Sequence, residues 1–173
     1  MSDVNKIFDA DEIAQRIEQL ADKIETTIKG DFVIVGLLKG SFMFVADLAR
    51  ALGRRGLAPR IEFMQVSSYG NSKESSGKVR INGEPPGSID GRQVLLIDDI
   101  IDTGRTLLHT NRLLQEMGAT RVWNCCLLAK PSRHVVECPV DFTGFEVDDV
   151  FVVGYGIDYA EKYRYLPYIG IVD

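Results

Sequence analysis

The chain has 173 residues, of which 45% are hydrophobic and 26% are charged, as in an ordinary folded domain with a full hydrophobic core. Its 25 Asp and Glu residues outnumber its 20 Lys and Arg residues, giving a formal net charge of −5, and we therefore expect no nucleic-acid partner. No apolar run approaches the ~20 residues that span a bilayer, and the polar, acidic start lacks the apolar centre of a signal peptide; we expect a cytoplasmic protein with no membrane contact.

The first strong pattern in the chain is that of an amphipathic helix. Apolar side chains recur every three or four residues, at Ile13, Ile17, Leu20, Ile24 and Ile28, which is the spacing of one helical face. Asp9 or Asp11 precedes this run, and either is a suitable N-cap. The pattern predicts a helix that packs one face against a core.

A buried strand and a second helix follow. Residues 32–38 are almost wholly apolar and rich in β-branched side chains, which is typical of a strand buried on both faces of a parallel sheet. Ser41 is a candidate N-cap for a helix over residues 42–52, and we expect Gly53 to end it.

A further strand is predicted at residues 61–66, before a long polar segment. Residues 67–76 carry no apolar periodicity, and loops of this length in compact domains are uncommon and often serve as active-site lids. A plain surface loop is the alternative interpretation. Residues 83–91 are rich in turn-forming residues.

The clearest strand lies at residues 94–97, followed by a helix over residues 104–117 that Gly118 is expected to end. Residues 121–128 form the next predicted strand and contain the adjacent Cys125 and Cys126. Because the total of three cysteines is odd and no pair has metal-site spacing, we expect small buried thiols in a reducing compartment.

Strands and helices alternate from residue 10 to about residue 128, which favours an α/β fold with a central, mainly parallel sheet flanked by helices. After Pro131 the pattern changes to short aromatic and β-branched runs broken by Pro and Gly. We expect one domain over residues 1–173, with a core of about residues 1–130 and a small cap, mainly residues 131–173.

The segment over residues 94–106 is the most informative for chemistry. A buried parallel strand ends at the sheet edge where α/β proteins bind ligands, and three carboxylates follow, at Asp98, Asp99 and Asp102. Residues 102–106 then open a helix, offering free backbone N–H groups, two hydroxyls and a guanidinium to a phosphate. Because carboxylates accept hydrogen bonds from diols and hold magnesium, the combination predicts a sugar-phosphate site. An acidic strand–helix corner with a capping Thr is the alternative.

The same segment, VLLIDDIIDTGRT, resembles the signature of type I phosphoribosyltransferases that binds 5-phosphoribosyl-1-pyrophosphate (PRPP). Three other segments resemble the 6-oxopurine branch of that family, in its bacterial form, and the likeness covers nearly the whole chain. They are a pyrophosphate loop (residues 37–41), the start of a mobile lid (Ser68 and Tyr69) and a purine-binding hood (Lys130, residues 151–155, Asp158, Tyr159 and Arg164).

This resemblance implies an enzyme of purine salvage. It would transfer the phosphoribosyl group from PRPP to hypoxanthine, and also to guanine, and release IMP or GMP and pyrophosphate with the help of Mg²⁺. It also implies the type I fold with a C-terminal hood and a flexible active-site loop, and a homo-oligomer, either dimer or tetramer. A PRPP-fold regulator that binds RNA, and an enzyme that prefers xanthine, are the alternatives.

The resemblance also implies a role for each matching residue. Lys39, Gly40 and Arg164 would bind pyrophosphate, while Asp98 and Asp99 would bind the ribose hydroxyls and shape a magnesium site. Asp158 would bind a second magnesium. Asp102 would be the general acid/base beside the purine. The groups around the 5′-phosphate and ribose would be Asp98, Asp99, Asp102, Thr103, Gly104, Arg105 and Thr106.

For the base, Lys130 would donate to the purine O6, Phe151 would stack on the ring, and Val152 and Asp158 would contact its edge. Each residue also has a plainer interpretation. Lys39 and Lys130 could be solvated strand-end lysines, Arg164 a surface ion pair, Asp102 an N-cap, Phe151 a core aromatic and Tyr69 an exposed loop residue. Arg105 stands where many relatives carry Lys, which leaves the charge unchanged.

Overall fold

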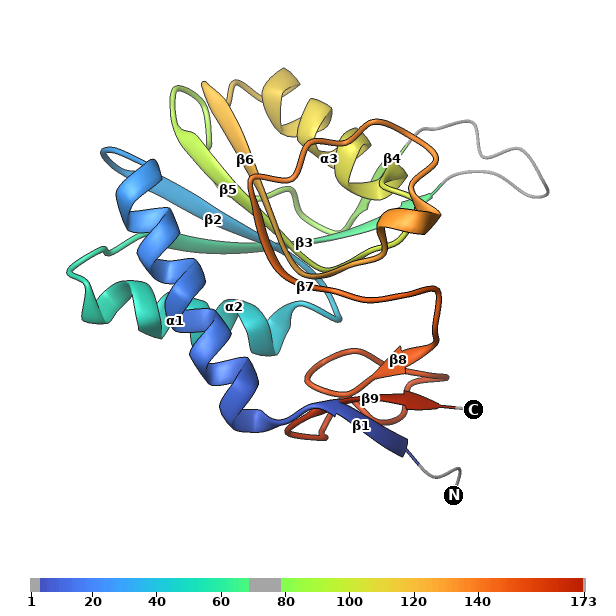
Figure 1. Cartoon of the computed structure of the whole chain (residues 1–173). Helices are drawn as coiled ribbons and strands as arrows, with labels where there is room; N and C mark the ends of the chain where they lie inside the picture. The colour runs from blue at the N-terminus through green and yellow to red at the C-terminus, as the bar shows by residue number, and fades with distance from the viewer. Residues whose placement is uncertain (1–3, 69–78, 173) are drawn as a thin grey trace.

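The computed structural model describes residues 4–68 and 79–172, and its centre is a six-stranded sheet (Figure 1). The strand order is β4-β3-β2-β5-β6-β7, and neighbouring strands are parallel except for the antiparallel pair β3 and β4. The strands of this sheet are β2 (Phe32–Leu37), β3 (Arg60–Ser68), β4 (Val79–Asn82), β5 (Gln93–Ile101), β6 (Arg121–Ala129) and β7 (Phe142–Glu146). The α/β fold with a mainly parallel sheet is confirmed.

Helices cover both faces of this sheet, as Figure 1 shows: α1 (Ala10–Thr27) and α2 (Phe42–Arg54) on one face, α3 (Arg105–Glu116) on the other. Side chains along β2 alternate between two hydrophobic cores, with Ile34 packed on the α1 and α2 side and Val33 and Val35 on the α3 side. This two-sided burial explains why the sequence of β2 is apolar at every position.

Helix α1 begins with a capping box. The Asp9 carboxylate accepts from the Glu12 backbone N–H at 2.8 Å, and the Glu12 carboxylate accepts from the Asp9 N–H at 2.8 Å. Of the two predicted caps, Asp9 is therefore the one used, because only it has a glutamate three residues later to complete the box.

Helix α2 differs from its prediction at both ends. Ser41 stands at the N-cap position, but its hydroxyl donates back to the Leu37 carbonyl at 2.6 Å and does not cap the helix. Gly53 does not end the helix, which runs to Arg54; the positive φ of +78° falls instead at Gly56. Gly53 lies inside the last turn, where no left-handed conformation is required.

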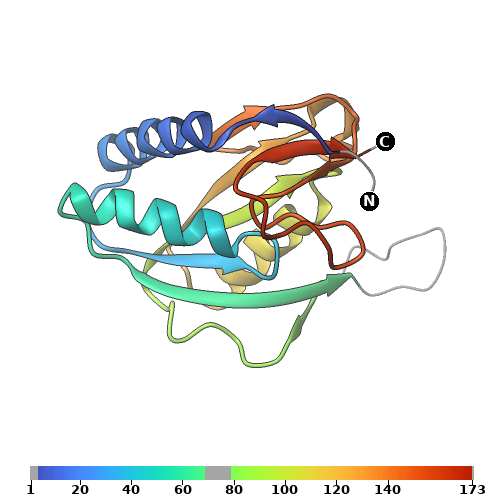
Figure 2. The ribbon, with the colours of Figure 1, turned by 90° about the horizontal axis from the view of Figure 1, so that it is seen from below.

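A second sheet, with order β1-β9-β8, lies beside the first (Figures 1 and 2). It comprises β1 (Val4–Phe8), β8 (Val152–Val153) and β9 (Ile169–Val172), with Val4 opposite Val172 and Val152 opposite Ile171. We call this sheet and the connecting residues 154–168 the hood. The division between core and cap that we expected at residue 130 therefore differs in the structure. Strand β1 belongs to the hood, and β7 belongs to the main sheet. Partners this distant in sequence leave no local pattern to predict the pairing.

Two further differences concern strand limits. The polar segment expected from residue 67 begins two residues later, since Ser67 and Ser68 belong to β3, and β4 pairs antiparallel with β3 through Ser68 and Val79. The flexible loop expected over the rest of this segment, residues 69–76, lies outside the described residues. A short 3₁₀ turn, η1 (Pro131–Arg133), follows β6.

All three cysteines are buried free thiols, as expected, with Cys125 and Cys126 inside β6. Burial raises the pKa of the Cys126 thiol to about 12, so that it is neutral at physiological pH. Among the described residues, no helix has the length and apolar character needed to cross a membrane.

Candidate active site

The site predicted from the sequence forms where the central strands β2, β5 and β6 end. Leu37, Ile101 and Ala129 end these adjacent parallel strands, so the segments that follow them emerge at one edge of the sheet. Three of the segments singled out in the sequence leave this edge: the 37–41 loop, residues 102–106 and Lys130. Ligands of open α/β sheets bind at this carboxyl edge.

Asp98 and Asp99 lie within β5, which extends four residues beyond its predicted end because Asp98 pairs with Cys126 and Ile101 with Ala129. The Asp99 backbone N–H donates to the Asp98 carboxylate at 3.0 Å. Burial, and then the charge of Asp99 beside it, raise the pKa of Asp98 well above its ordinary value. The pair is thus an acidic site that a bound cation or hydroxyl donors would stabilise.

Residues 102–106 form a tight corner between β5 and α3. Gly104 is the N-cap with φ +82°, and a Cβ there would lie 3.3 Å from both Cys138 Cβ and Val136 Cγ2. The corner borders a cavity of about 80 Å³, lined by Asp98, Ile100, Ile101, Asp102, Thr103, Gly104, Thr106 and Leu107. Backbone N–H groups at the start of α3, beginning with Arg105, lie at this corner and suit a phosphate.

Asp102 is not the N-cap of α3, a position that Gly104 occupies. Its carboxylate pairs with Arg133 of η1, with Arg133 Nε 2.9 Å from Asp102 Oδ1. Arg133 Nε also lies 3.6 Å from Asp149. The two side chains of the Asp102–Arg133 pair are nearly half exposed, so the carboxylate remains accessible to a ligand.

The 37–41 loop lies between the acidic strand and the hood. The peptide between Leu38 and Lys39 is cis. A Cβ at Gly40 would lie 1.7 Å from Asp99 Oδ2, and a Cβ at Gly156 would lie 2.4 Å from the Gly40 carbonyl oxygen. Only glycine at both positions allows the loop to approach β5 on one side and the hood on the other.

The cationic groups of the loop and the hood converge on one carboxylate. Lys39 Nζ lies 3.0 Å from Glu161 Oε2, and Arg164 Nη2 lies 3.5 Å from Glu161 Oε1. Arg164 also pairs with Asp158 at 2.8 Å and donates to the Gly156 carbonyl at 2.8 Å. The structure therefore brings Lys39 and Arg164 together, as an anion site requires.

The predicted purine-binding residues lie in different environments. Lys130, directly after β6, is buried with 7% exposure, which is uncommon for a lysine. Phe151 is 54% exposed and contacts Tyr159 edge-on, with ring centroids 5.1 Å apart; it is not a core aromatic. Val152 is buried in β8, and its backbone is held by pairing with β9.

The remaining predictions concern the metal and the lid. In the ranges 4–68 and 79–172, no group of three or more His, Cys, Asp or Glu side chains is arranged to hold a metal ion. Asp158 forms no such group with Asp98 and Asp99, and its two oxygens contact Arg164 and the Glu161 N–H. Of the two lid residues, Ser68 ends β3 and Tyr69 lies outside the described residues.

Sequence reasoning missed Arg133 and Glu161. Arg133 follows Lys130 by three residues, and Glu161 precedes Arg164 by three, but such spacings occur on any charged surface. Their partners, Asp102 and Lys39, are 31 and 122 residues away, respectively. Only the folded chain reveals these pairs.

Comparison with known proteins gives consistent matches. The model of the phosphoribosyl transferase domain matches residues 3–160. Hypoxanthine phosphoribosyltransferase of Escherichia coli K12 is 45% identical over 164 residues, covering 93% of this chain and 90% of that protein. Hypoxanthine-guanine phosphoribosyltransferase of Dictyostelium discoideum is 42% identical over 95% of this chain and 92% of its own length.

Among solved structures, hypoxanthine phosphoribosyltransferase of Trypanosoma cruzi in complex with the product IMP superimposes with a TM-score of 0.91. It is 34% identical, and the match covers 99% of this chain and 95% of that one. The similarity thus extends over the main sheet and the hood together.

Proposed function

This chain belongs to the phosphoribosyl transferase family, and on that premise we propose that it is a purine-salvage enzyme. It transfers the 5-phosphoribosyl group of PRPP to hypoxanthine, and also to guanine, giving IMP or GMP and pyrophosphate. The observation that carries this proposal is the meeting of an anion site and a diol-binding acidic pair at one edge of the sheet. Lys39 and Arg164 supply the first, and Asp98 and Asp99 the second.

PRPP matches this arrangement group by group. Its 5′-phosphate suits the corner at residues 103–106, where helix α3 begins. The ribose hydroxyls suit Asp98 and Asp99, since carboxylates accept two such bonds. Its pyrophosphate suits Lys39 and the loop at Gly40, with Arg164 on the hood side. In the reaction, cations and backbone donors stabilise the leaving pyrophosphate while C1′ gains positive character.

Asp102 is the general acid/base of the proposed reaction. It takes or returns the proton of the purine nitrogen as the new bond to C1′ forms. Its position between the acidic strand and the phosphate corner, and its nearly half-exposed carboxylate, support this role. Arg133 holds the carboxylate from the side of η1, which fixes its orientation while leaving a face open.

Selection among bases rests on Lys130 and the hood. The ammonium of Lys130, a residue that is largely buried, donates to the O6 of hypoxanthine or guanine, and it would meet another donor in the 6-amino group of adenine. The exposed ring of Phe151 stacks on the base, and the backbone at Val152 reads the purine edge together with Asp158. This backbone reading decides between hypoxanthine, guanine and xanthine.

Mg²⁺ is the proposed cofactor. The acidic pair fits it, because burial and then the charge of Asp99 raise the pKa of Asp98, so a bound cation would stabilise the ionised pair. Magnesium prefers one or two carboxylates together with water and substrate oxygens. Asp98 and Asp99 would hold one ion and Asp158 another. When bound, the metal neutralises charge on the pyrophosphate.

Assembly and location are also proposed. The exposed apolar side chains of Leu38, within the 37–41 loop, and Phe42, directly after it, lie close in sequence, and those of Ile61 and Phe63 share one face of β3. They support a homo-oligomer, either dimer or tetramer, which light scattering would measure. Free buried thiols are typical of a reducing compartment, which supports a cytoplasmic enzyme.

The proposed activity can be tested directly. Purified protein is incubated with PRPP and Mg²⁺ and each of hypoxanthine, guanine, xanthine and adenine, and nucleotide formation is followed. Rapid product with the first two bases and none with adenine is expected. A rate with xanthine above the rates with hypoxanthine and guanine would make xanthine the preferred substrate. No product despite measurable PRPP binding would favour an RNA-binding regulator, which a labelled RNA hairpin at physiological salt would reveal.

A further inference from the structure

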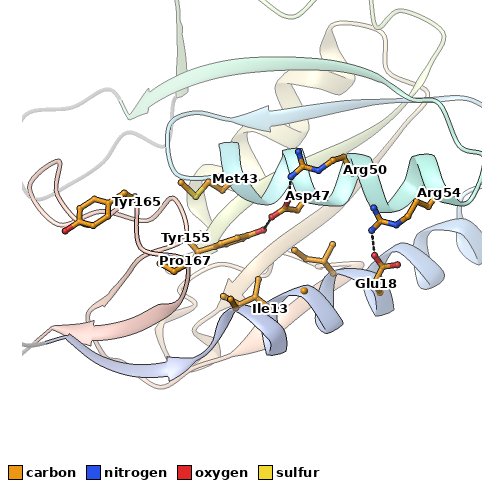
Figure 3. A pocket seen from close by; sticks show the side chains of 12 residues that line it. Ile13, Glu18, Met43, Asp47, Arg50, Arg54, Tyr155, Tyr165 and Pro167 are labelled. Carbon is orange, nitrogen blue, oxygen red and sulfur yellow. Dashed lines mark hydrogen bonds and ion pairs between the residues drawn. The ribbon is translucent and has the colours of Figure 1, made fainter.

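A tyrosine of the hood is hydrogen-bonded to helix α2. The Tyr155 hydroxyl donates to the Asp47 carboxylate, which also pairs with Arg50 one turn further along the helix. Figure 3 shows this chain of contacts on the wall of a groove of about 460 Å³ between α1, α2 and the hood. In the described part of the chain, this groove shares no lining residue with the cavity at the phosphate corner. The contact therefore lies outside the substrate site.

The turn that carries Tyr155 has an unusual backbone. Gly154, Tyr155 and Gly156 all have positive φ, at +100°, +51° and +97°. For tyrosine this region is strained and persists only where its surroundings impose it. A Cβ at Gly154 would lie 2.0 Å from the Tyr168 carbonyl oxygen, and a Cβ at Gly156 would lie 2.4 Å from that of Gly40. The turn thus packs between Tyr168, in another part of the hood, and the 37–41 loop.

This turn joins two parts of the proposed site. On its N-terminal side, β8 carries Val152, whose backbone is held by β9. On its C-terminal side, the Gly156 carbonyl accepts from Arg164 Nη1 at 2.8 Å, and the Gly156 N–H donates to the Arg164 carbonyl at 3.0 Å. The position of Arg164 therefore follows the position of the turn.

At the other end of the contact, Asp47 lies in α2, whose first residue, Phe42, comes directly after the 37–41 loop. The Phe42 N–H donates to the Lys39 carbonyl at 3.3 Å, which connects the loop to the helix. A hydrogen bond from Tyr155 to Asp47 thus spans from the element that holds Arg164 to the element that holds Lys39.

We propose that Tyr155 and Asp47 are positioning residues that set the separation between Arg164 in the hood and Lys39 and Gly40 in the loop. The inference rests on the proposed function, because the ligand between these two groups is the pyrophosphate of PRPP. Neither residue touches the reactants; both act through the turn and the helix. The purine contacts depend less on the pair, because Val152 is held by β9 and Lys130 by the main sheet.

The chemistry of the pair suits a fixed contact. Burial, and then the bond to Asp47, raise the pKa of Tyr155 above its ordinary value of 10. The phenol stays protonated through the neutral range and remains a donor. A bond between a hydroxyl and a carboxylate is also stronger than one between two neutral groups. The two sides of the anion site are therefore held together before any ligand binds.

The test compares Tyr155→Phe with Tyr168→Phe. Tyr168 is another hood tyrosine, whose ring lies 5.2 Å from Lys6 Nζ, so its variant controls for loss of a hydroxyl in the hood. For Tyr155→Phe, loss of one charge-assisted bond predicts a KM for PRPP and an inhibition constant for pyrophosphate that rise ~10-fold. The KM for hypoxanthine should change less than about two-fold. Tyr168→Phe should leave all three constants unchanged.

Substitutions at Asp47 separate positioning from simple loss of folding. Asp47→Asn keeps an acceptor and should stay near the wild-type constants, whereas Asp47→Leu should reproduce Tyr155→Phe. The double variant Tyr155→Phe with Asp47→Leu should lose no more than either single one. An unchanged KM for PRPP and an unchanged inhibition constant for pyrophosphate in Tyr155→Phe would overturn the proposal. A fall in kcat alone, with every KM unaltered, would overturn it as well.

Direct calorimetric titration with pyrophosphate and Mg²⁺ gives a readout that needs no turnover. If the wild-type protein formed no nucleotide, the proposed function would fail, and this titration would still decide the positioning role. Weaker binding by Tyr155→Phe than by Tyr168→Phe supports it, and equal binding by the two variants overturns it.

Discussion

Arg133 Nε lies 2.9 Å from the Asp102 carboxylate, and Asp149 lies 3.6 Å from the same nitrogen. One arginine thus contacts two carboxylates, and only one of them borders the cavity at the phosphate corner. This asymmetry provides a matched pair of substitutions for the proposed acid/base.

Asp102→Asn should lower kcat by about 10²- to 10⁴-fold, because the amide cannot take the purine proton. Binding of PRPP should change little, since the phosphate and ribose contacts remain. Steady-state kinetics and PRPP titration give the two quantities separately. Asp149→Asn removes a charge from the same arginine and should leave kcat within about two-fold. Equal losses in kcat and PRPP affinity for Asp102→Asn would contradict the acid/base role.

Lys130→Met should raise the KM for hypoxanthine by roughly 10- to 100-fold, the cost of losing one hydrogen bond from a charged donor. The KM for PRPP should not change. Because the methionine fills similar space without burying a charge, the melting temperature should hold or rise. The control is Lys162→Met, which replaces an exposed lysine of the hood. An unchanged hypoxanthine KM would exclude the O6 contact.

Glu161→Gln should strengthen binding of pyrophosphate and PRPP by about 2- to 5-fold. In the unliganded chain Glu161 pairs with Lys39 and Arg164, so an incoming anion must displace it. The Lys39 and Glu161 side chains are 55% and 66% exposed, which keeps this competition weak. Calorimetric titration with pyrophosphate measures the change, with Glu146→Gln, an exposed residue of β7, as the control. Weaker binding would show instead that Glu161 supports the site.

Asp98→Asn should stabilise the free protein near pH 7 while abolishing activity. Burial raises the pKa of Asp98 above 3.8, so the folded chain binds this proton more tightly than the unfolded chain does. The stability of the wild-type protein therefore falls as the pH rises from 3.8 through the folded-state pKa, and above that point the full cost is present. Thermal unfolding measured across pH should show that the melting temperature of the asparagine variant falls less with rising pH than that of the wild-type protein.

The control for that experiment is Asp31→Asn, which neutralises an exposed carboxylate at the start of β2. It should alter neither the melting temperature nor its pH dependence appreciably. A lower melting temperature for Asp98→Asn at every pH would mean that the carboxylate stabilises the free fold.

The main sheet and its helices were predictable because their signals are local. The apolar run of β2 and the recurring isoleucines of α1 report burial directly. The limits of elements were less predictable: Gly53 has an ordinary helical conformation within α2. Strand β5 continues past Ile97 because Asp98, Ile100 and Ile101 pair with β6. Polar residues at the carboxyl end of a strand are typical of a ligand-binding edge of a sheet. A strand predicted from hydrophobicity ends before these residues.

The site was predictable where one short segment holds its residues, as at 98–106. It was not predictable where distant side chains meet, as at Lys39 and Glu161 or at Tyr155 and Asp47. The burial of Lys130 was also hidden, since a lysine before Pro131 looks like a solvated strand end. These features depend on how the hood is placed on the sheet, which no window of sequence encodes.

The pairing of β1 with β9 has a consequence for the order in which the protein is made. Residues 4–8 are synthesised before every other described element, yet their strand partner at residues 169–172 is synthesised after all of the others. The main sheet can assemble during synthesis, since its strands lie between residues 32 and 146. The hood cannot form until β9 has been synthesised, and the backbone around Val152, which pairs with β9, cannot be fixed before then. A stalled or prematurely terminated chain could therefore form the corner at residues 102–106 but not the completed hood.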